Sequence, residues 1–153
     1  MTKRNVALSL AAAPAVAVLI SSCAPAGQNV AHSNLTVKCT ETISAGMDVT
    51  DGGVSGTGHC AMTGMLHDSG RATDYRTQNG ETAIIRRVVT GAKGTITFVI
   101  TIHLASGGGE PWTIRSGTNT YAELRGHGYQ VVDNFNGTPA TFVLKGTVSQ
   151  ARA

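Results

Sequence analysis

Four charged residues, Glu41, Asp74, Arg86 and Arg87, are the candidates for a chemical site within this chain. Arg86 and Arg87 form the only basic dipeptide after residue 22, in a segment rich in β-branched residues that favours a strand. Neighbouring side chains on a strand point to opposite faces, so we expect one of the two arginines to point inward. An inward arginine needs a partner, because a buried unpaired charge is costly. Glu41 and Asp74 are the carboxylates that could supply it.

This candidate polar cluster has two interpretations. It could be a structural ion bridge, or it could be a group inside a cavity that orients a ligand. Tyr75, Trp112 and Tyr121 are candidates for the rim of such a cavity, although Tyr121 could instead fix a glycine-rich turn. The histidines show no metal-binding spacing and no nucleophile motif is present. We therefore expect no metal and no cofactor, and the pattern assigns no catalytic residue.

Cys39 and Cys60 form an even pair of cysteines once Cys23 is set aside, because Cys23 belongs to the N-terminal export segment discussed below. In an oxidising compartment such a pair predicts a disulfide. Its loop of about twenty residues corresponds to about 3 kcal/mol in the chain-entropy model. The alternative is a metal or redox site, which the lack of a C-x-x-C spacing makes the weaker hypothesis.

The elements that must position these residues are strands. From Leu35 onward threonine alternates with valine and isoleucine, and glycine separates the segments. Asn79-Gly80 is a strong hairpin signal, and residues 118–124 have room for one helical turn. The expected strands cover residues 35–43, 56–66, 71–77, 82–90, 95–104, 126–133 and 140–148, with a further strand around Trp112 and Ile114.

About eight short strands with regularly spaced turns predict an all-β sandwich or barrel. Short links between successive strands favour an antiparallel up-and-down arrangement. Eight strands can close into a barrel that is either filled or wide enough for one small ligand. We therefore expect a single eight-stranded barrel domain over residues 35–149.

Residues 1–22 have the pattern of an export signal, with Lys3 and Arg4 before an apolar stretch of about fifteen residues. That stretch is shorter than the roughly 20 residues of a membrane-spanning helix. The sequence Ile20-Ser21-Ser22-Cys23 resembles the bacterial lipobox. The resemblance implies cleavage before Cys23 and lipidation of its sulfur, with the membrane as partner.

Residues 23–34 would then be a lipidated, flexible tether, and the domain would face the extracytoplasmic side of the cell envelope. The alternative is ordinary cleavage after Ala24-Pro25-Ala26, which would release a soluble protein. Removing residues 1–22 takes away two basic residues and lowers the formal net charge from +3 to +1. With only seven aromatic residues as well, the sequence argues against a nucleic-acid partner.

A stretch in the C-terminal third, residues 114–128, reads IRSGTNTYAELRGHG. It resembles the signature of the allene oxide cyclase-like and dirigent-like barrels, with Ser116 and Asn119 standing where glycines are usual. Residues 64–70 and 142–148 are also similar, and the resemblance covers roughly residues 39–149. It implies an eight-stranded, calycin-like barrel with a central cavity. The matching positions are Gly117, Thr118, Tyr121, Gly126, His127 and Gly128.

Members of these families steer a ring closure or bind phenolic radicals, but the resemblance transfers no catalytic residue to this chain. Three functions remain open. The chain could be a lipid-anchored module that binds a small apolar molecule, which we favour over an enzyme. It could be an isomerase or cyclase that works through a few polar groups. It could also be a structural or interaction protein with a solid core. The first two require a cavity of several hundred Å³.

Overall fold

The computed structural model describes residues 32–44, 51–105, 109–134 and 139–150. The expected signal sequence 1–22, the lipidation candidate Cys23 and most of the expected tether 23–34 lie outside the described residues. Among the described residues no helix is both long and apolar enough to cross a membrane.

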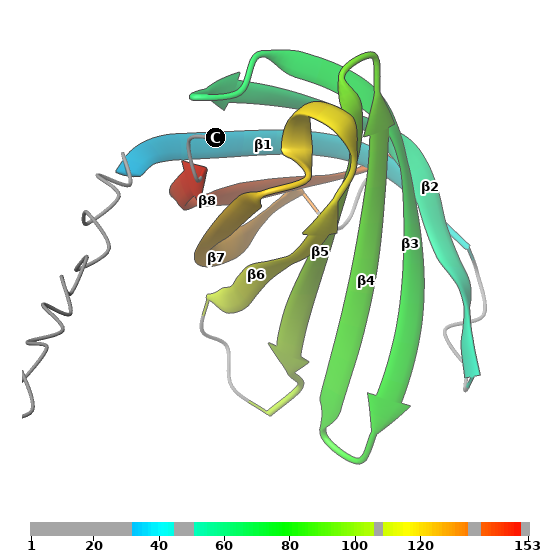
Figure 1. Ribbon diagram of the computed structural model, residues 1–153. Helices are drawn as coiled ribbons and strands as arrows, with labels where there is room; N and C mark the ends of the chain where they lie inside the picture. The colour runs from blue at the N-terminus through cyan, green and yellow to red at the C-terminus, as the bar shows by residue number, and fades with distance from the viewer. Residues whose placement is uncertain (1–31, 45–50, 106–108, 135–138, 151–153) are drawn as a thin grey trace, which may run out of the picture.

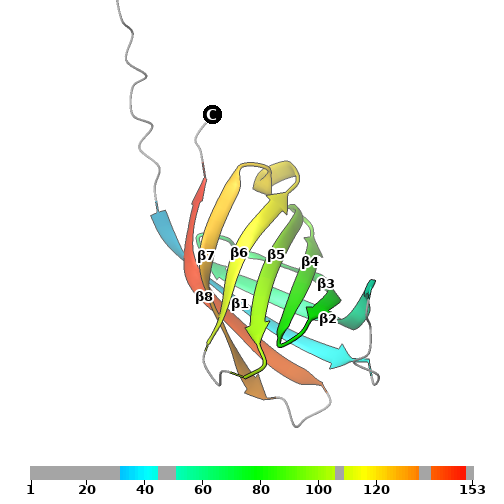
Figure 2. The ribbon, with the colours of Figure 1, turned by 90° about the horizontal axis from the view of Figure 1, so that it is seen from below.

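The chain folds into a closed, antiparallel, up-and-down barrel, which confirms the predicted fold class (Figure 1). Each strand pairs with the next along the chain, and the last pairs with the first. Strands β4 to β7 therefore lie side by side in chain order (Figure 2). The strands are β1 (His32–Ile43), β2 (Asp51–Gly64), β3 (Asp68–Asn79), β4 (Thr82–Gly91), β5 (Gly94–His103), β6 (Glu110–Gly117), β7 (Leu124–Asn134) and β8 (Ala140–Gln150).

Strict alternation explains why these segments form a barrel. On β5, Ile96, Phe98 and Ile100 are fully buried, while Thr97 and Val99 between them are partly exposed. One face is thus apolar and faces the interior, and the other is compatible with solvent. The predicted Asn-Gly hairpin joins β3 to β4, where Gly80 takes a positive φ of 58° that other residues rarely adopt.

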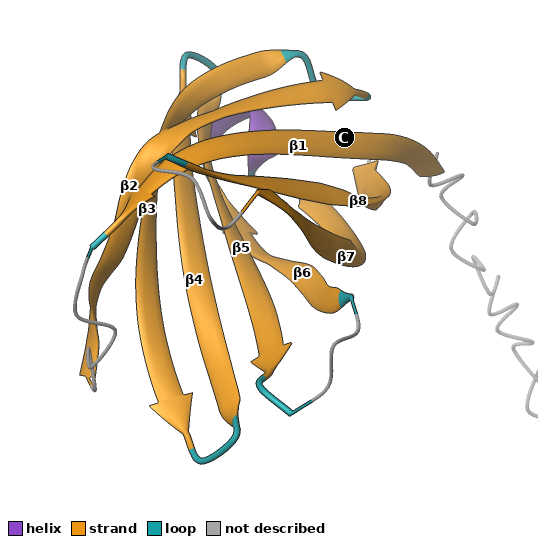
Figure 3. Cartoon of the chain, turned by 180° about the vertical axis from the view of Figure 1, so that it is seen from behind, coloured by secondary structure: helices purple, strands orange, loops and turns teal. Residues whose placement is uncertain are grey.

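The predicted helical turn is the 3₁₀ helix η1 (Asn119–Tyr121), coloured purple in Figure 3. Asn119 has a positive φ of 52°, a conformation that asparagine tolerates better than most residues. Some strands differ in length from the expectation, because β2 begins at Asp51 and ends at Gly64, and β3 already begins at Asp68. The turn predicted at residues 67–70 is therefore shorter than expected.

A large aromatic side chain packs in the middle of the barrel interior. Trp112 on β6 is fully buried and meets Phe98 edge-on, with ring centroids 5.6 Å apart. It pairs across the ladder with Gly128, and a Cβ on Gly146 would lie 2.6 Å from its indole ring. Gly146 on β8 therefore leaves part of the space that the indole occupies. Towards η1 the interior is filled by buried side chains such as Ile96, Tyr121 and Leu124, and this end is called here the closed end.

The predicted disulfide joins Cys39 on β1 to Cys60 on β2, and the structure confirms it. The two residues are direct partners in the antiparallel register, so their side chains face each other inside the barrel. Both are fully buried. The bond thus links β1 to β2. On its other side β1 pairs with the last strand, β8.

Candidate functional site

A cavity of about 340 Å³ occupies the end of the barrel opposite to the closed end. Its lining comes from the last residues of β1, β3, β5 and β7 and from the first residues of β2, β4, β6 and β8, which meet at this end. We call this the open end. The apolar part of the wall consists of Ile43, Ile85, Ile102, Leu104, Val132 and Phe142.

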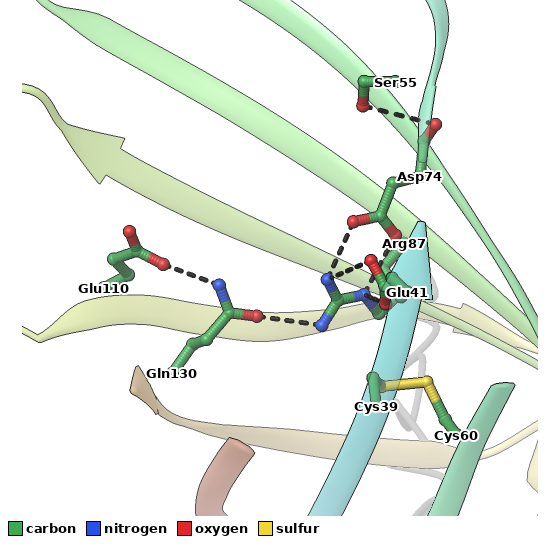
Figure 4. A network of polar contacts seen from close by, with 8 residues as sticks. All are labelled: Cys39, Glu41, Ser55, Cys60, Asp74, Arg87, Glu110 and Gln130. Atoms are coloured by element: carbon green, nitrogen blue, oxygen red, sulfur yellow. Dashed lines mark hydrogen bonds and ion pairs between the residues drawn. A yellow bond between two sulfur atoms is a disulfide. The ribbon is translucent and has the colours of Figure 1, made fainter. Parts of the chain in front are cut away.

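Arg87 is the centre of the polar part of the wall (Figure 4). It is 1% exposed, and its Nε and Nη2 donate to the two carboxylate oxygens of Asp74 at 2.9 and 2.7 Å. The same Nη2 donates to Oε2 of Glu41 at 3.0 Å, and Oε1 of Glu41 lies 2.8 Å from Nε. One guanidinium is therefore shared by two carboxyl groups, one on β1 and one on β3.

The network continues across the barrel to β7 and β6. Nη1 of Arg87 donates to Oε1 of Gln130 at 2.9 Å, and Nε2 of Gln130 donates to Oε2 of Glu110 at 2.6 Å. On the other side, Ser55 Oγ donates to the backbone oxygen of Asp74 at 3.4 Å. The chain of hydrogen bonds thus spans the cavity wall from β2 to β6 (Figure 4).

Two carboxyl groups share one buried cation, so the cluster would carry an excess negative charge if both were ionised. Protonation of one carboxyl group removes that excess. Burial raises the pKa of Glu41; the Arg87 guanidinium lowers it, and the Asp74 carboxylate raises it again, so that it reaches about 8. Burial by itself would lower the pKa of Arg87, but its contacts with Asp74 and Glu41 outweigh burial and raise it. A pKa of about 8 favours the protonated form of Glu41 at neutral pH, beside the paired Arg87 and Asp74.

Among solved structures, the pterocarpan synthase dirigent protein GePTS1 is similar to this chain, with a TM-score of 0.58. The match covers 89% of this chain and 100% of that one, at 14% sequence identity. The chain has the dirigent-like eight-stranded barrel fold. No family model and no curated protein matches the sequence. The likeness therefore concerns the fold, and the site has to be argued from the residues of this chain.

The dirigent-like barrel brings together three of the four residues of the candidate polar cluster. Glu41, Asp74 and Arg87 meet inside, whereas Arg86 lies on the outer face. Its guanidinium carbon stacks 4.1 Å from the ring centre of Tyr75, its direct partner on β3. Strand alternation explains the difference, because Arg86 and Arg87 are neighbours on β4 and must face opposite sides.

The three aromatic residues considered for the rim lie elsewhere. Tyr75 points outward under Arg86, and Trp112 packs in the middle of the interior, outside the cavity lining. Tyr121 is 1% exposed, and its hydroxyl donates to Oδ2 of Asp68 at 2.7 Å. That bond lowers the pKa of Asp68, and burial together with the bond raises the pKa of Tyr121. Tyr121 therefore has the turn-fixing role that its place in the glycine-rich segment suggested.

Asp68 also accepts hydrogen bonds from the backbone NH groups of Ser69 and Lys93. Lys93 in turn donates from Nζ to the backbone oxygen of His67. The loop after β2, the turn between β4 and β5, and η1 are thus fastened together at the closed end.

Cys39, Cys60 and Glu41 are the described residues whose ligand atoms come close enough to hold a metal ion. The two sulfurs are joined to each other, and the Glu41 carboxyl is already bonded to Arg87. A disulfide sulfur is not a thiolate, which is the form that binds metals. Cys39 and Cys60 therefore fit a disulfide next to the Glu41–Arg87 contact better than the three residues fit a metal centre.

Sequence reasoning missed four polar residues of the wall, Ser55, Arg76, Glu110 and Gln130. Arg76 could have been found by alternation, because it lies two residues after Asp74 on the same strand and faces the same side. Gln130 and Glu110 carry no local signal. Their place next to Arg87 depends on the closure of β6 and β7 against the rest of the barrel.

Proposed function

We propose that this protein is an exported, lipid-anchored barrel that binds a small, largely apolar molecule at its open end. The cavity of about 340 Å³ carries this proposal. It falls within the range of about 300 to 1,000 Å³ that is typical of small-molecule sites, and a mostly apolar wall with a few converging polar groups is their usual composition. A solid-core structural protein would have side chains filling this space.

Binding can be tested with the neutral fluorescent probe N-phenyl-1-naphthylamine and a matched pair of variants. Ile102→Trp places a large side chain in the cavity wall, whereas Ile84→Trp places the same side chain on the outer face, where Ile84 is 43% exposed. We expect saturable binding by the wild type and by I84W, and a loss of at least tenfold in affinity in I102W. Absence of saturable binding, or equal binding by both variants, would contradict the proposal.

The lipid anchor rests on the lipobox-like sequence before Cys23. Mass spectrometry of the mature N-terminus is expected to show a diacylglyceryl group on Cys23, and a Cys23→Ser variant is expected to leave the membrane fraction. A soluble chain that begins at Gly27 would refute the anchor and leave the binding proposal intact.

The direction of β1 has a consequence for such an anchored protein. β1 begins at His32 at the closed end and finishes at Ile43 in the cavity wall. A tether that joins the barrel at His32 would therefore be attached at the end opposite to the cavity, so the anchor would leave the open end unobstructed.

An isomerase or cyclase is the second candidate function, and the convergence of Glu41, Asp74 and Arg87 favours it. A carboxyl with a pKa of about 8 is protonated at neutral pH and can donate a proton to a bound molecule. For an enzyme of this kind, ligand recovered from the wild type would differ chemically from the ligand added. Glu41→Gln would return the ligand unchanged. Unchanged ligand from both proteins would leave binding as the function.

A further inference from the structure

Arg76, on β3 beside the polar cluster, is the one cavity-lining cation without a carboxylate partner among the described residues. It is 9% exposed and lines the cavity. Its Nη2 donates to Oε1 of Gln78 at 2.7 Å, and Nε2 of Gln78 donates to the backbone oxygen of Gly80 in the hairpin turn at 3.2 Å. Gln78 is neutral, so these contacts orient the guanidinium without balancing its charge.

The Nε of Arg76 is buried and has no hydrogen-bond partner. A buried donor left unsatisfied costs free energy, and a buried cation without a counter-ion costs more. Arginine has five N–H donors, and here only one of them is used in a bond between described side chains. The side chain therefore has both the charge and the free donors to bind an anionic oxygen group.

We propose that Arg76 makes this a site for an amphipathic ligand, one with an apolar body and a single carboxylate that binds the Arg76 guanidinium. The inference deepens the proposed function and rests on it. The apolar body would lie against Ile43, Ile102 and Phe142, while the carboxylate satisfies both the buried Nε and the unpaired charge. A neutral acceptor such as an alcohol could accept a hydrogen bond from the buried Nε but would not balance the charge of Arg76.

The neighbouring charges are compatible with an anion. Arg87 is balanced by Asp74 in a two-point pair, and the protonated Glu41 adds no negative charge at neutral pH. Glu110 accepts a hydrogen bond from the neutral Gln130, which does not balance its charge, but it lies on β6, separated from Arg76 on β3 by the Arg87–Gln130 part of the network. Among the described residues of the wall, Arg76 is thus the cation that remains available to a ligand.

The test compares two probes with the same apolar body, 2-naphthoate and 2-naphthalenemethanol, by calorimetric titration at pH 7. We expect the carboxylate to bind the wild type at least about tenfold more tightly than the alcohol, as a charge-assisted bond in a shielded site would give. Arg76→Gln should make the two affinities nearly equal, and Arg76→Lys should keep part of the difference. Arg86→Gln removes the same charge from the outer face and should leave the difference unchanged.

The outcomes separate the inference from the function on which it rests. If neither probe binds any of these proteins, the proposed function fails. If both probes bind the wild type equally, or if R76Q keeps the full preference, the cavity binds apolar molecules but the inference about Arg76 is overturned. Should R76Q fold poorly, the wild type alone decides through the NMR signal of the Arg76 Nε–H. That signal should shift with 2-naphthoate and hardly with the alcohol, and a signal that ignores 2-naphthoate overturns the inference.

Discussion

Replacing Glu41 with glutamine should change how the stability of the barrel depends on pH. In the unfolded chain Glu41 has an ordinary pKa of 4.5, and in the folded chain its pKa is about 8. Between these values the folded state holds a proton that the unfolded state has lost. The free energy of unfolding of the wild type therefore falls as pH rises through this window, by up to about 1.4 kcal/mol per pH unit from this group.

Glutamine cannot ionise, so E41Q lacks this contribution. Its carbonyl oxygen can keep the bond that Oε2 of Glu41 accepts from Nη2 of Arg87. The stability of E41Q relative to the wild type should thus increase by about 3 kcal/mol between pH 5 and pH 7.5. Other titrating groups cancel in this difference, because they are present in both proteins.

The assay is urea unfolding at several pH values, followed by the fluorescence of the single tryptophan, Trp112, with the disulfide intact. Glu123→Gln serves as the control, because Glu123 is exposed near η1 and far from the cluster. Its difference from the wild type should stay flat over the same pH range. A flat difference for E41Q as well would refute the reasoning that Glu41 is protonated in the folded protein.

Three further changes test the packing of the barrel by thermal or urea unfolding. Tyr121→Phe removes the bond to Asp68 and should cost about 1 to 2 kcal/mol, and a variant as stable as the wild type would contradict the fastening role. Gly146→Ala would press a methyl group against the backbone oxygen of His127 and the indole of Trp112 and should cost about 3 kcal/mol or more, while Gly109→Ala, where a Cβ meets only ordinary contacts, should cost much less. Reducing the buried disulfide should lower the free energy of unfolding by about 3 kcal/mol, and an unchanged urea midpoint would show that the cross-link contributes nothing.

The fold could be predicted because its signals are local. Alternation along each strand, as at Ile96, Phe98 and Ile100, and turn residues such as Gly80 depend only on near neighbours in the sequence. The same alternation placed one arginine of the dipeptide inside, and the structure shows that it is Arg87.

The rest of the site depends on contacts between strands far apart in the chain. Gln130 is separated from Arg87 by 43 residues, and only barrel closure brings the two together. The position of Trp112 likewise depends on Gly146 of β8, which leaves room for its indole. Residue types at single positions do not encode how distant strands align with one another. For this reason Tyr75, Trp112 and Tyr121, which the sequence suggested for the cavity rim, lie elsewhere in the structure.

The central claim is that the open end of the barrel binds a small molecule, and a ¹H–¹⁵N NMR titration with 2-naphthoate tests it most directly. We expect saturable shifts concentrated on the amides of Ile43, Ile102 and Phe142, with the amides of η1 at the closed end almost unmoved. Shifts that do not saturate, or that gather around η1 instead, would contradict the claim.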